Sequence, residues 1–259
     1  MLSWLFPKKT PSSSFGDQEI QEDFSNIESI ADYFKDLTGV TFDKQISILN
    51  SKTKSFCLSY GIYSYNELLE KISHDEDLKQ DLINRLTTNE TFFYREFNQI
   101  AELVSLIKQD THPVRILCAP CATGEESYSI AIALLEAGVP KTKFTIMGID
   151  INSEAIEKAK EGIYRERNVR NLSDEIRQRY FTQHGDMFHL TPEIKSLIEF
   201  KIFNIFEENF KKLEKFDYIF SRNMLIYFDM QTKQKAVKIL ESMRKDQAKK
   251  IFFGHADLF

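Results

Sequence analysis

The stretch VRILCAPCATGEE at residues 114–126 decides the fold. Its apolar first half predicts a short buried strand, its small residues predict a loop, and a helix is expected to follow over 125–135. A second strand is expected over 144–150 (FTIMGID), followed by a helix over 153–160 with Ser153 as its N-cap. A repeated order of strand, loop and helix is typical of a parallel sheet covered by helices.

The remaining elements extend this pattern. Further strands are predicted over 200–203, 216–220 and 250–253, and a further helix over 231–243. Residues 162–198 interrupt the alternation, because they are charged and contain Gly185 and Pro192. We expect an inserted small subdomain there, with a helix and a hairpin. The expected fold class is therefore α/β, with a doubly wound parallel sheet.

The amino-terminal part of the chain has a different character. Residues 1–20 are rich in proline and serine and predict a flexible tail. Residues 21–88 carry little strand signal, and Ile27 and Ile30 follow helical spacing. We therefore expect a small all-helical domain over 21–88, ahead of a catalytic domain over 89–259.

Composition excludes several classes of protein. With 42% hydrophobic residues and 22 phenylalanines among 259 residues, the chain can fill a core, which a disordered chain cannot. The net charge of −5 argues against a nucleic-acid partner. Three cysteines do not make a disulfide scaffold. Neither a run of ~20 apolar residues nor a signal peptide is visible, so a cytoplasmic protein without direct membrane insertion is expected.

Acidic residues stand where ligands bind in such sheets, at the carboxyl ends of the strands. Glu125 and Glu126 open the first helix of the sheet region and would repel a pyrophosphate, unless they only complement the helix dipole. Asp150 ends the second strand, where a carboxylate accepts hydrogen bonds from ribose hydroxyls, unless it merely caps the next helix. Since the G-x-G-x-x-G fingerprint of NAD sites is absent, a positively charged adenosine is favoured, and S-adenosylmethionine fits that description.

Two further segments combine polar groups with aromatics where loops should face the ligand, LTTNETFFYRE at 86–96 and FSRNMLIYFD at 220–229. With ATGEESYSIA at 122–131, GIYR at 162–165 and FGHAD at 253–257, they make the chain resemble the CheR-type chemotaxis receptor methyltransferases, from about residue 25 to residue 259. The resemblance implies a Rossmann-like, S-adenosylmethionine-dependent methyltransferase sheet with a small helical N-terminal domain and a small β-subdomain insertion. This family transfers a methyl group to glutamate side chains on the cytoplasmic helical bundle of chemotaxis receptors, leaving S-adenosyl-L-homocysteine.

The resemblance also implies the site residues. Those implied to bind the cofactor are Asn89, Thr91, Arg95, Gly124, Glu126, Asp150, Asn204, Ile205, Arg222 and Asn223. Arg95 and Tyr227 are implied to lie beside the reacting centre, and we expect them to be catalytic. We expect Arg95 to fix the substrate carboxylate and Tyr227 to lend a hydrogen bond.

Docking of the receptor is expected in the helical domain. Residues 43–60 contain Lys44, Lys52 and Lys54 and one acid, so this stretch is locally positive. The alternative is that it is an ordinary solvated helix face without a partner. The family usually carries arginines there, and lysine lacks their bidentate fork for carboxylates. In some members the inserted subdomain binds a peptide at the receptor's carboxyl terminus by strand addition, which the sequence leaves open here. The resemblance implies recruitment to receptor arrays at the membrane.

Several alternatives stay open. A module that binds S-adenosylmethionine without catalysis, or a methyltransferase with another substrate, would share much of the pattern. Cys118 and Cys121 have the spacing of a metal or redox pair, but no second Cys/His cluster accompanies them, so packing is favoured and no metal is expected. The sequence ends five residues after Gly254, where the family usually continues through a final antiparallel strand, so the completion of that sheet edge is also open.

Overall fold

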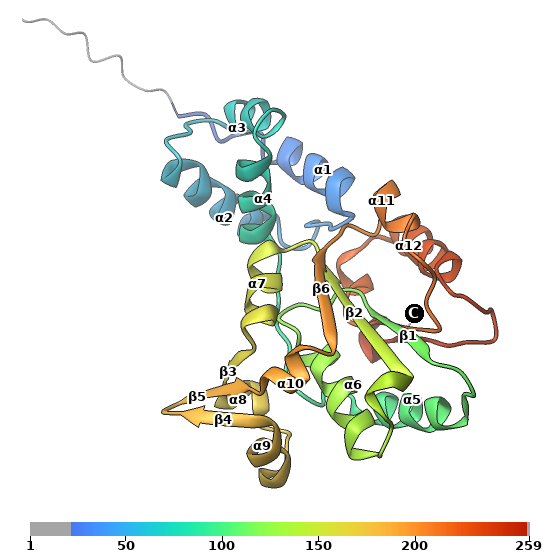
Figure 1. The fold of residues 1–259 in the computed structure, drawn as a ribbon. Coiled ribbons are helices and arrows are strands. Elements are labelled where there is room, and N and C mark those ends of the chain that lie inside the picture. Colours follow the sequence, from blue (N-terminus) through green and yellow to red (C-terminus); the bar gives the residue numbers. More distant parts are fainter. Residues whose placement is uncertain (1–21, 258–259) are drawn as a thin grey trace, which may run out of the picture.

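The computed structural model describes residues 22–257, so the flexible tail expected at 1–20 lies outside the described residues. Its centre is a five-stranded parallel sheet with the strand order β6-β2-β1-β7-β8 (Figure 1). The strands of this sheet are β1 (Val114–Cys118), β2 (Phe144–Asp150), β6 (Ile198–Ile202), β7 (Tyr218–Ser221) and β8 (Ile251–Phe253). Since the chain builds outward from β1 to β6 and then returns to the other side of β1 through β7, the expected doubly wound α/β fold is confirmed.

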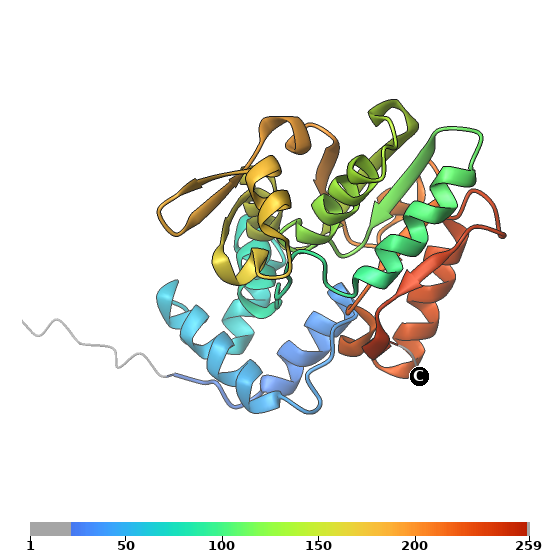
Figure 2. The same cartoon turned by 90° about the horizontal axis from the view of Figure 1, so that it is seen from below.

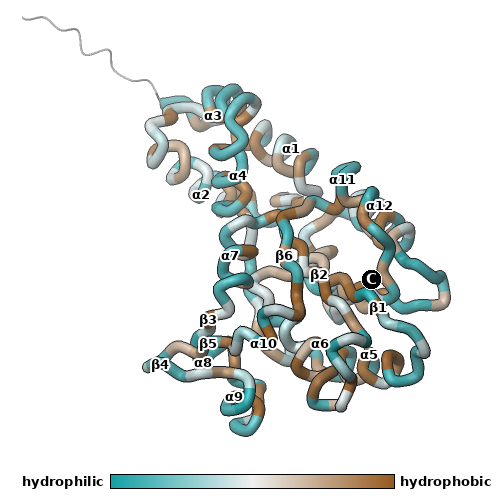
Figure 3. Tube along the Cα trace, in the orientation of Figure 1, coloured by the Kyte–Doolittle hydropathy of each residue, from teal (hydrophilic) through white to brown (hydrophobic). Residues whose placement is uncertain are grey.

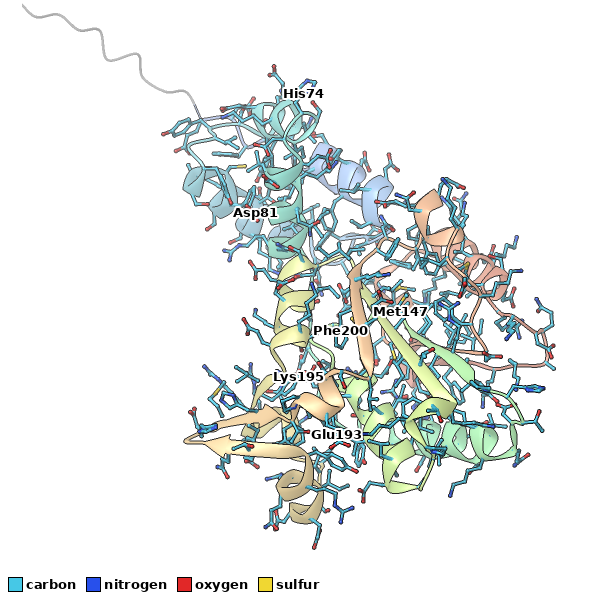
Figure 4. The ribbon with its side chains drawn as sticks, viewed as in Figure 1. His74, Asp81, Met147, Glu193, Lys195 and Phe200 are labelled. Carbon is cyan, nitrogen blue, oxygen red and sulfur yellow. The ribbon has the colours of Figure 1, made fainter. Side chains whose placement is uncertain are left out.

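Helices cover both faces of this sheet. The elements around it are α5 (Phe97–Gln109), α6 (Glu125–Glu136), α7 (Ser153–Glu161), α11 (Glu208–Lys211) and α12 (Met230–Ser242), with 3₁₀ turns at Lys141–Lys143, Leu225–Tyr227 and His255–Asp257. Because side chains alternate along a strand, β1 sends Ile116 into one core with α5, α6 and α7, and Leu117 into another with α11 and α12. Phe200 of β6 and Met147 of β2, labelled in Figure 4, likewise belong to these two different cores.

The amino-terminal helices form a small domain with its own core, as expected. They are α1 (Ile27–Thr38), α2 (Ile46–Ser59), α3 (Tyr65–Ile72) and α4 (Glu76–Leu86). Ile30, Phe34, Leu49 and Leu68 are fully buried between them. These helices lie beyond the end of the sheet where β2 and β6 finish, and Figure 3 shows polar and apolar segments alternating along them. Within residues 22–257, no helix is both long enough and apolar enough to cross a bilayer.

The segment between α7 and β6 forms the inserted subdomain. Its elements are β3 (Ile163–Arg165), α8 (Glu166–Val169), α9 (Asp174–Tyr180), β4 (Phe181–His184), β5 (Met187–Leu190) and α10 (Pro192–Lys195). The strand β5 pairs antiparallel with β3 on one side and with β4 on the other. The small β-subdomain is therefore confirmed, and Figure 2 shows it on the far side of the molecule from α12.

One local prediction is wrong, because the N-cap of α7 is Asn152 and not Ser153. The Asn152 side chain accepts a hydrogen bond from the amide of Ala155 at 2.8 Å, and Ser153 is already the first helical residue. Asparagine and serine cap helices about equally well, so propensity cannot separate them. Ser153 has another partner, since its amide donates to Asn84 Oδ1 of α4 at 2.9 Å. This bond ties the helical domain to the loop that follows β2.

Candidate active site

A cleft lies at the carboxyl ends of the parallel strands, between the helical domain and the sheet, and it consists of two connected parts. The part that we call the apolar chamber has walls that include Val40, Phe42, Ile149, Ile205 and Phe228. The part that we call the charged chamber has walls that include Thr91, Arg95, Glu126, Arg222 and Ile226. Both chambers are lined by Thr88, Asn89, Pro120, Ala122, Asn223 and Tyr227. These shared residues make the cleft continuous.

Asp150 ends β2 and lies buried in the wall of the apolar chamber. Its Oδ2 accepts a hydrogen bond from the amide of Ala122 at 2.9 Å, and its Oδ1 accepts one from the amide of Asn152 at 2.9 Å. Burial raises the pKa of Asp150 to about 6, although these amides act in the opposite direction. A carboxylate has about four lone-pair sites, so Asp150 keeps acceptor capacity for the hydroxyl groups of a ligand.

The charged chamber contains a buried ion pair between Glu126 of α6 and Arg222, which follows β7. Arg222 Nε lies 2.5 Å from Glu126 Oε2, and the side chains of Arg222 and Glu126 are 3% and 9% exposed. The other nitrogens of Arg222 donate hydrogen bonds, Nη2 to the carbonyl oxygen of Arg95 at 2.7 Å and Nη1 to that of Glu96 at 3.4 Å. The second oxygen of the carboxylate, Glu126 Oε1, is buried without a hydrogen-bond partner. Burial raises the pKa of Glu126, with Arg222 opposing the rise.

Backbone strain is concentrated in the loops that build the cleft. Among the described residues, the non-glycine residues with positive φ are Tyr94 (56°), Glu96 (49°), Ala122 (46°) and Asn223 (59°). They lie in the segment before α5, the loop after β1 and the loop after β7. Such conformations cost about 1–3 kcal/mol each and persist where the surrounding structure shapes a loop for a ligand. The strain therefore marks the same loops that line both chambers.

Asp257 holds the loop after β7 in place, a role that the sequence does not reveal. It is 1% exposed and accepts hydrogen bonds from the backbone amides of Asn223 (2.5 Å), Gly254 (3.0 Å) and Ile226 (3.2 Å). Burial raises the pKa of Asp257, while these amides lower it. Asp257 lines neither chamber, so it acts by fixing the backbone of residues that do. The FGHAD motif marks the segment, but no spacing rule says where its carboxylate points.

The two residues expected to be catalytic, Arg95 and Tyr227, come from different loops and both line the charged chamber. Arg95 is half-buried, and its Nη1 donates to the carbonyl oxygen of Glu90 at 3.2 Å. Burial raises the pKa of Tyr227, with the positive charge of Arg95 opposing the rise. A neutral phenol and a guanidinium therefore share one wall. This combination suits the binding of an anion better than the removal of a proton.

Most of the residues predicted to bind the cofactor lie together. The predicted residues that line one or both chambers are Asn89, Thr91, Arg95, Glu126, Asp150, Asn204, Ile205, Arg222 and Asn223. Gly124 lines neither chamber. Its φ is +92°, and a Cβ added there would lie 2.9 Å from the Cβ of Ala159 and 3.1 Å from the ring of Phe200. The turn and the packing against α7 and β6 therefore require this glycine.

The three lysines predicted to dock the substrate have different surroundings. Lys54 pairs with Glu22 at 3.0 Å, and its Nζ lies 4.9 Å from the ring centre of Phe24. Lys44 is exposed in the turn before α2. Lys52 is half-buried and lines the apolar chamber. Of the three, only Lys52 lies at the cleft.

The helical domain supplies one wall of the apolar chamber, which the sequence analysis did not predict. Its residues in that wall include Thr38, Val40, Thr41, Phe42, Ile48 and Leu86. Thr41 also bonds across the cleft, since its amide donates to the carbonyl oxygen of Tyr227 at 2.8 Å. Periodicity cannot separate such wall residues from core residues, because both are mostly apolar and follow helical spacing.

Of the two other groups considered from the sequence, the cysteine pair touches the charged chamber only through Cys121, and His255 lies outside both chambers. Cys118 is fully buried and Cys121 nearly so, and burial raises the pKa of both thiols well above its ordinary range. Such thiols behave as small apolar packing groups. His255 has a 76% exposed side chain whose Nδ1 lies 2.9 Å from Glu96 Oε2, and it lines neither chamber.

The donor and acceptor groups of the cleft fit S-adenosylmethionine. Glu126 Oε1 is a buried acceptor without a donor, and the ammonium group of the amino-acid end would supply one. Asp150 would accept the ribose hydroxyls, and the apolar walls around Ile205 and Phe228 suit an adenine ring. The acids that open α6 disfavour a diphosphate at the same place, as the sequence indicates.

Comparisons with known proteins agree with this chemistry. A family model described as "CheR methyltransferase, SAM binding domain" matches residues 89–259. A chemotaxis protein methyltransferase of Campylobacter jejuni subsp. jejuni serotype O:23/36 (strain 81-176) is 35% identical over 224 residues, which are 86% of this chain and 84% of that protein. Chemotaxis protein methyltransferase 2 of Pseudomonas aeruginosa is 28% identical over 263 residues, 98% of this chain and 93% of that protein. The chemotaxis protein methyltransferase of Escherichia coli (strain K12) is 33% identical over 200 residues, 75% of this chain and 69% of that protein.

The family model covers the cleft-bearing sheet region, and the Pseudomonas relative matches nearly the whole chain, helical domain included. The residues of the cleft and the matched family point to the same cofactor. The chain therefore belongs to the CheR methyltransferase family and is an S-adenosylmethionine-dependent methyltransferase.

Proposed function

We propose that this methyltransferase methylates the side-chain carboxylates of glutamates in the cytoplasmic helical bundle of chemotaxis receptors, giving glutamate methyl esters. The relatives described above bear the name chemotaxis protein methyltransferase. The observation that carries the proposal is the presence of Arg95 and Tyr227 in the charged chamber, beside the pair of Glu126 and Arg222. A group that attracts anions, next to a site for a cationic methyl donor, is what methylation of a carboxylate requires.

The reaction needs no general base. A glutamate side chain has a pKa of about 4.3, so more than ~99% of it is ionised at neutral pH. When bound, S-adenosylmethionine supplies an electrophilic methyl group on a positively charged sulfur. Arg95 attracts the incoming carboxylate, and the Tyr227 hydroxyl donates a hydrogen bond that fixes its angle. Holding two reactants in line can lower a barrier by up to about 7–11 kcal/mol, so positioning carries most of the catalysis.

The buried ion pair couples cofactor binding to the position of Arg95. Arg222 holds Glu126 on one side and the carbonyl oxygens of Arg95 and Glu96 on the other. The same guanidinium therefore orients the carboxylate that would meet the cofactor ammonium and the backbone that carries the substrate-binding arginine. The helical domain forms one wall of the neighbouring apolar chamber, where it would limit the access of water to the adenosine part.

The domains divide the work in this proposal. Residues 89–259 hold the cofactor and carry the chemistry, and residues 21–88 dock the receptor bundle through the exposed side of α2. Lys44, exposed in the turn before α2, and Lys52, half-buried at the cleft, would attract the acidic bundle, since the charge of Lys54 is already compensated by Glu22.

The inserted subdomain, residues 162–198, offers a second contact. Its strand β4 forms one edge of the three-stranded sheet, and Thr182, Gln183 and His184 on it are exposed. A receptor tail peptide would add to that edge as a further strand. In this proposal the enzyme works at receptor arrays on the inner face of the membrane.

Incubation of the purified chain with radiolabelled S-adenosylmethionine and receptor-enriched membranes tests the proposal. We expect methyl incorporation into receptor glutamates that is released by base, as esters are. Tight cofactor binding without transfer would instead support a non-catalytic binding module, and base-stable label in another molecule would support a methyltransferase with a different substrate. Either result would overturn the proposed substrate.

A further inference from the structure

A groove connects the charged chamber with the inserted subdomain. Residues 89–92 line both the charged chamber and this groove, and β3 and α8 supply its far wall. We call it the arginine groove and define it by Lys158, Arg165, Arg167 and Arg170. The proposed methyl transfer uses none of these four cations.

The arginine groove is locally positive in a chain whose net charge is −5. The exposed cations in its walls are Lys158, Arg165, Arg167 and Arg170, and the exposed acids are Glu90 and Glu161. The third acid in its walls, Glu125, is buried and already accepts hydrogen bonds from Thr123 Oγ1 at 2.6 Å and Asn168 Nδ2 at 2.8 Å. Accessible positive charge therefore exceeds accessible negative charge along the groove.

The arginines of the groove form no salt bridge with neighbouring acids, although the charge of Arg167 acts on the buried Glu125 and lowers its pKa against the rise caused by burial. Within residues 22–257, no carboxylate forms an ion pair with Arg165, Arg167 or Arg170. Glu166, which lies beside them on α8, is paired instead with Arg177 at 2.8 Å. Guanidinium groups left without a carboxylate at a concave surface are available to an acidic ligand.

The Phe92 side chain links this groove to the proposed reaction centre. The Cζ atom of Arg170 lies 4.1 Å from the centre of the Phe92 ring, and that of Arg95 lies 5.7 Å from the same centre. Arg170 is held further by its Nη1, which donates to the carbonyl oxygen of Arg167 at 2.9 Å. Contacts with an aromatic face orient a guanidinium and leave its N–H groups free to bind a carboxylate. Arg95 in the charged chamber and Arg170 in the groove therefore both contact the ring of Phe92.

We propose that the arginine groove binds a second acidic side chain of the protein substrate, next to the glutamate that is methylated. This inference rests on the proposed function, because it takes the carboxylate held by Arg95 to be the target. On a helix, side chains three or four residues apart lie on the same face, about one turn of 5.4 Å from each other. A substrate helix that presents its target to Arg95 brings a neighbouring acid toward Arg170. The groove thus selects targets in acidic surroundings.

Charge explains why such a contact is useful to this enzyme. An acidic protein repels an acidic partner at long range, and a local positive surface reverses that repulsion at the point of contact. Arginine is better suited than lysine to this role, since its planar fork matches both oxygens of a carboxylate. The groove carries three arginines, whereas the helix predicted to dock the receptor carries lysines.

Binding of a designed peptide tests the groove separately from catalysis. The probe is a labelled 21-residue helical peptide with glutamates on one face at i, i+4 and i+8, compared with the same peptide carrying glutamines there. We expect the full chain to bind the glutamate peptide about tenfold more tightly at low salt, with the preference shrinking as salt rises. In Arg167→Ala/Arg170→Ala the preference should fall to within about twofold, and in Arg167→Glu/Arg170→Glu it should reverse.

The matched control is Arg85→Ala, an exposed arginine on α4 that lies outside the groove and both chambers and should keep the full preference. An unchanged preference for the glutamate peptide in Arg167→Glu/Arg170→Glu, or no such preference in the natural chain, would contradict the proposal that the groove binds an acidic side chain. The reaction is measured separately, as methyl transfer to receptor-enriched membranes. If the natural chain transfers methyl groups but shows no preference for the glutamate peptide, the groove proposal alone is refuted. If it binds the glutamate peptide selectively but transfers no methyl group, the proposed function alone is refuted.

Discussion

The apolar chamber and the charged chamber share six wall residues, but they differ in the groups that hold their buried acids. In the apolar chamber the one buried acid, Asp150, is held by backbone amides, and the helical domain closes the wall opposite the sheet. In the charged chamber Glu126 is held by a buried arginine and keeps one oxygen without a partner. Affinity for the adenosine part and control of charge near the reacting atoms are therefore separated along one cleft. Substitutions in the apolar chamber should therefore mainly weaken cofactor binding, whereas substitutions in the charged chamber should mainly disturb the charges near the reacting atoms.

The largest loss of stability and of cofactor binding is expected from Glu126→Ala in the charged chamber. The change leaves Arg222 buried without its partner, and breaking a buried pair in this way typically costs about 3–5 kcal/mol of the free energy of unfolding. Cofactor binding should be lost with it. Urea unfolding of Lys250→Ala is the control, since Lys250 and Glu102 are 46% and 45% exposed and such a pair is worth about 0–1 kcal/mol. Similar losses in the two variants would contradict the buried ion pair.

The next effect is expected from Asp257→Ala, which acts on the charged chamber from outside. Three backbone amides lose their acceptor, and an unsatisfied buried group costs about 1–3 kcal/mol. Because Asn223 and Tyr227 lie on the loop that is released, methyl transfer should fall more than stability alone explains. The exposed Asp246, which accepts from the amide of Ala248, provides the matched Asp246→Ala control. Full activity of folded Asp257→Ala would show that the carboxylate only stabilises the fold.

A pH dependence should distinguish the apolar chamber. The pKa of Asp150 is raised to about 6, so lowering the pH through that value protonates it and weakens its acceptance of ribose hydroxyls. Cofactor affinity, measured by calorimetry between pH 5 and 7.5, should therefore fall below about pH 6 by up to about tenfold per pH unit. Asp150→Asn should bind weakly at every pH and show a flatter profile. Parallel profiles in the two proteins would exclude Asp150 as the titrating group.

The smallest effect is expected at the edge of the apolar chamber, among the docking lysines. Lys52→Ala should raise the KM for receptor substrate by about 3–10-fold, because an unpaired charge near the mouth steers an acidic partner. Lys54→Ala should change it by less than about twofold, because Glu22 already compensates that charge. Cofactor affinity is measured beside KM, since Lys52 also lines the chamber. Equal effects would mean that the helix contributes only its overall charge.

The parallel, doubly wound sheet and the position of the cleft could be predicted from the sequence, because alternating strands and helices restrict the possible topologies. Apolar runs mark β1, β2, β6, β7 and β8, and parallel strands place their carboxyl ends at one edge. Asp150 is the last residue of β2 and Arg222 directly follows β7, so both had to lie near that edge. The details of how they are held, by amides in one case and by Glu126 in the other, were not predictable.

Other features depend on contacts between distant parts of the chain and leave no local signal. The acceptor role of Asp257 requires the loop after β7 to fold over it, and the wall formed by Phe42 and Leu86 requires the helical domain to sit on the sheet. Gly124 shows a related limit, because a glycine in a ligand loop is indistinguishable by sequence from a glycine that packs against Ala159 and Phe200. The N-cap of α7 is Asn152 and not the predicted Ser153. Here too a contact with a distant part of the chain is involved, since the amide of Ser153 donates to Asn84 of α4.

The central claim is that the charged chamber positions the substrate carboxylate through Arg95 without depending on it for cofactor affinity. Arg95→Ala keeps the backbone carbonyl that Arg222 uses, so the cofactor site should persist. The decisive measurement pairs calorimetric binding of S-adenosylmethionine with the rate of methyl transfer to receptor substrate. We predict a dissociation constant within about threefold of the natural chain and turnover reduced about 100-fold, the scale expected when a reactant is misplaced. Equal losses in affinity and in turnover would contradict the account.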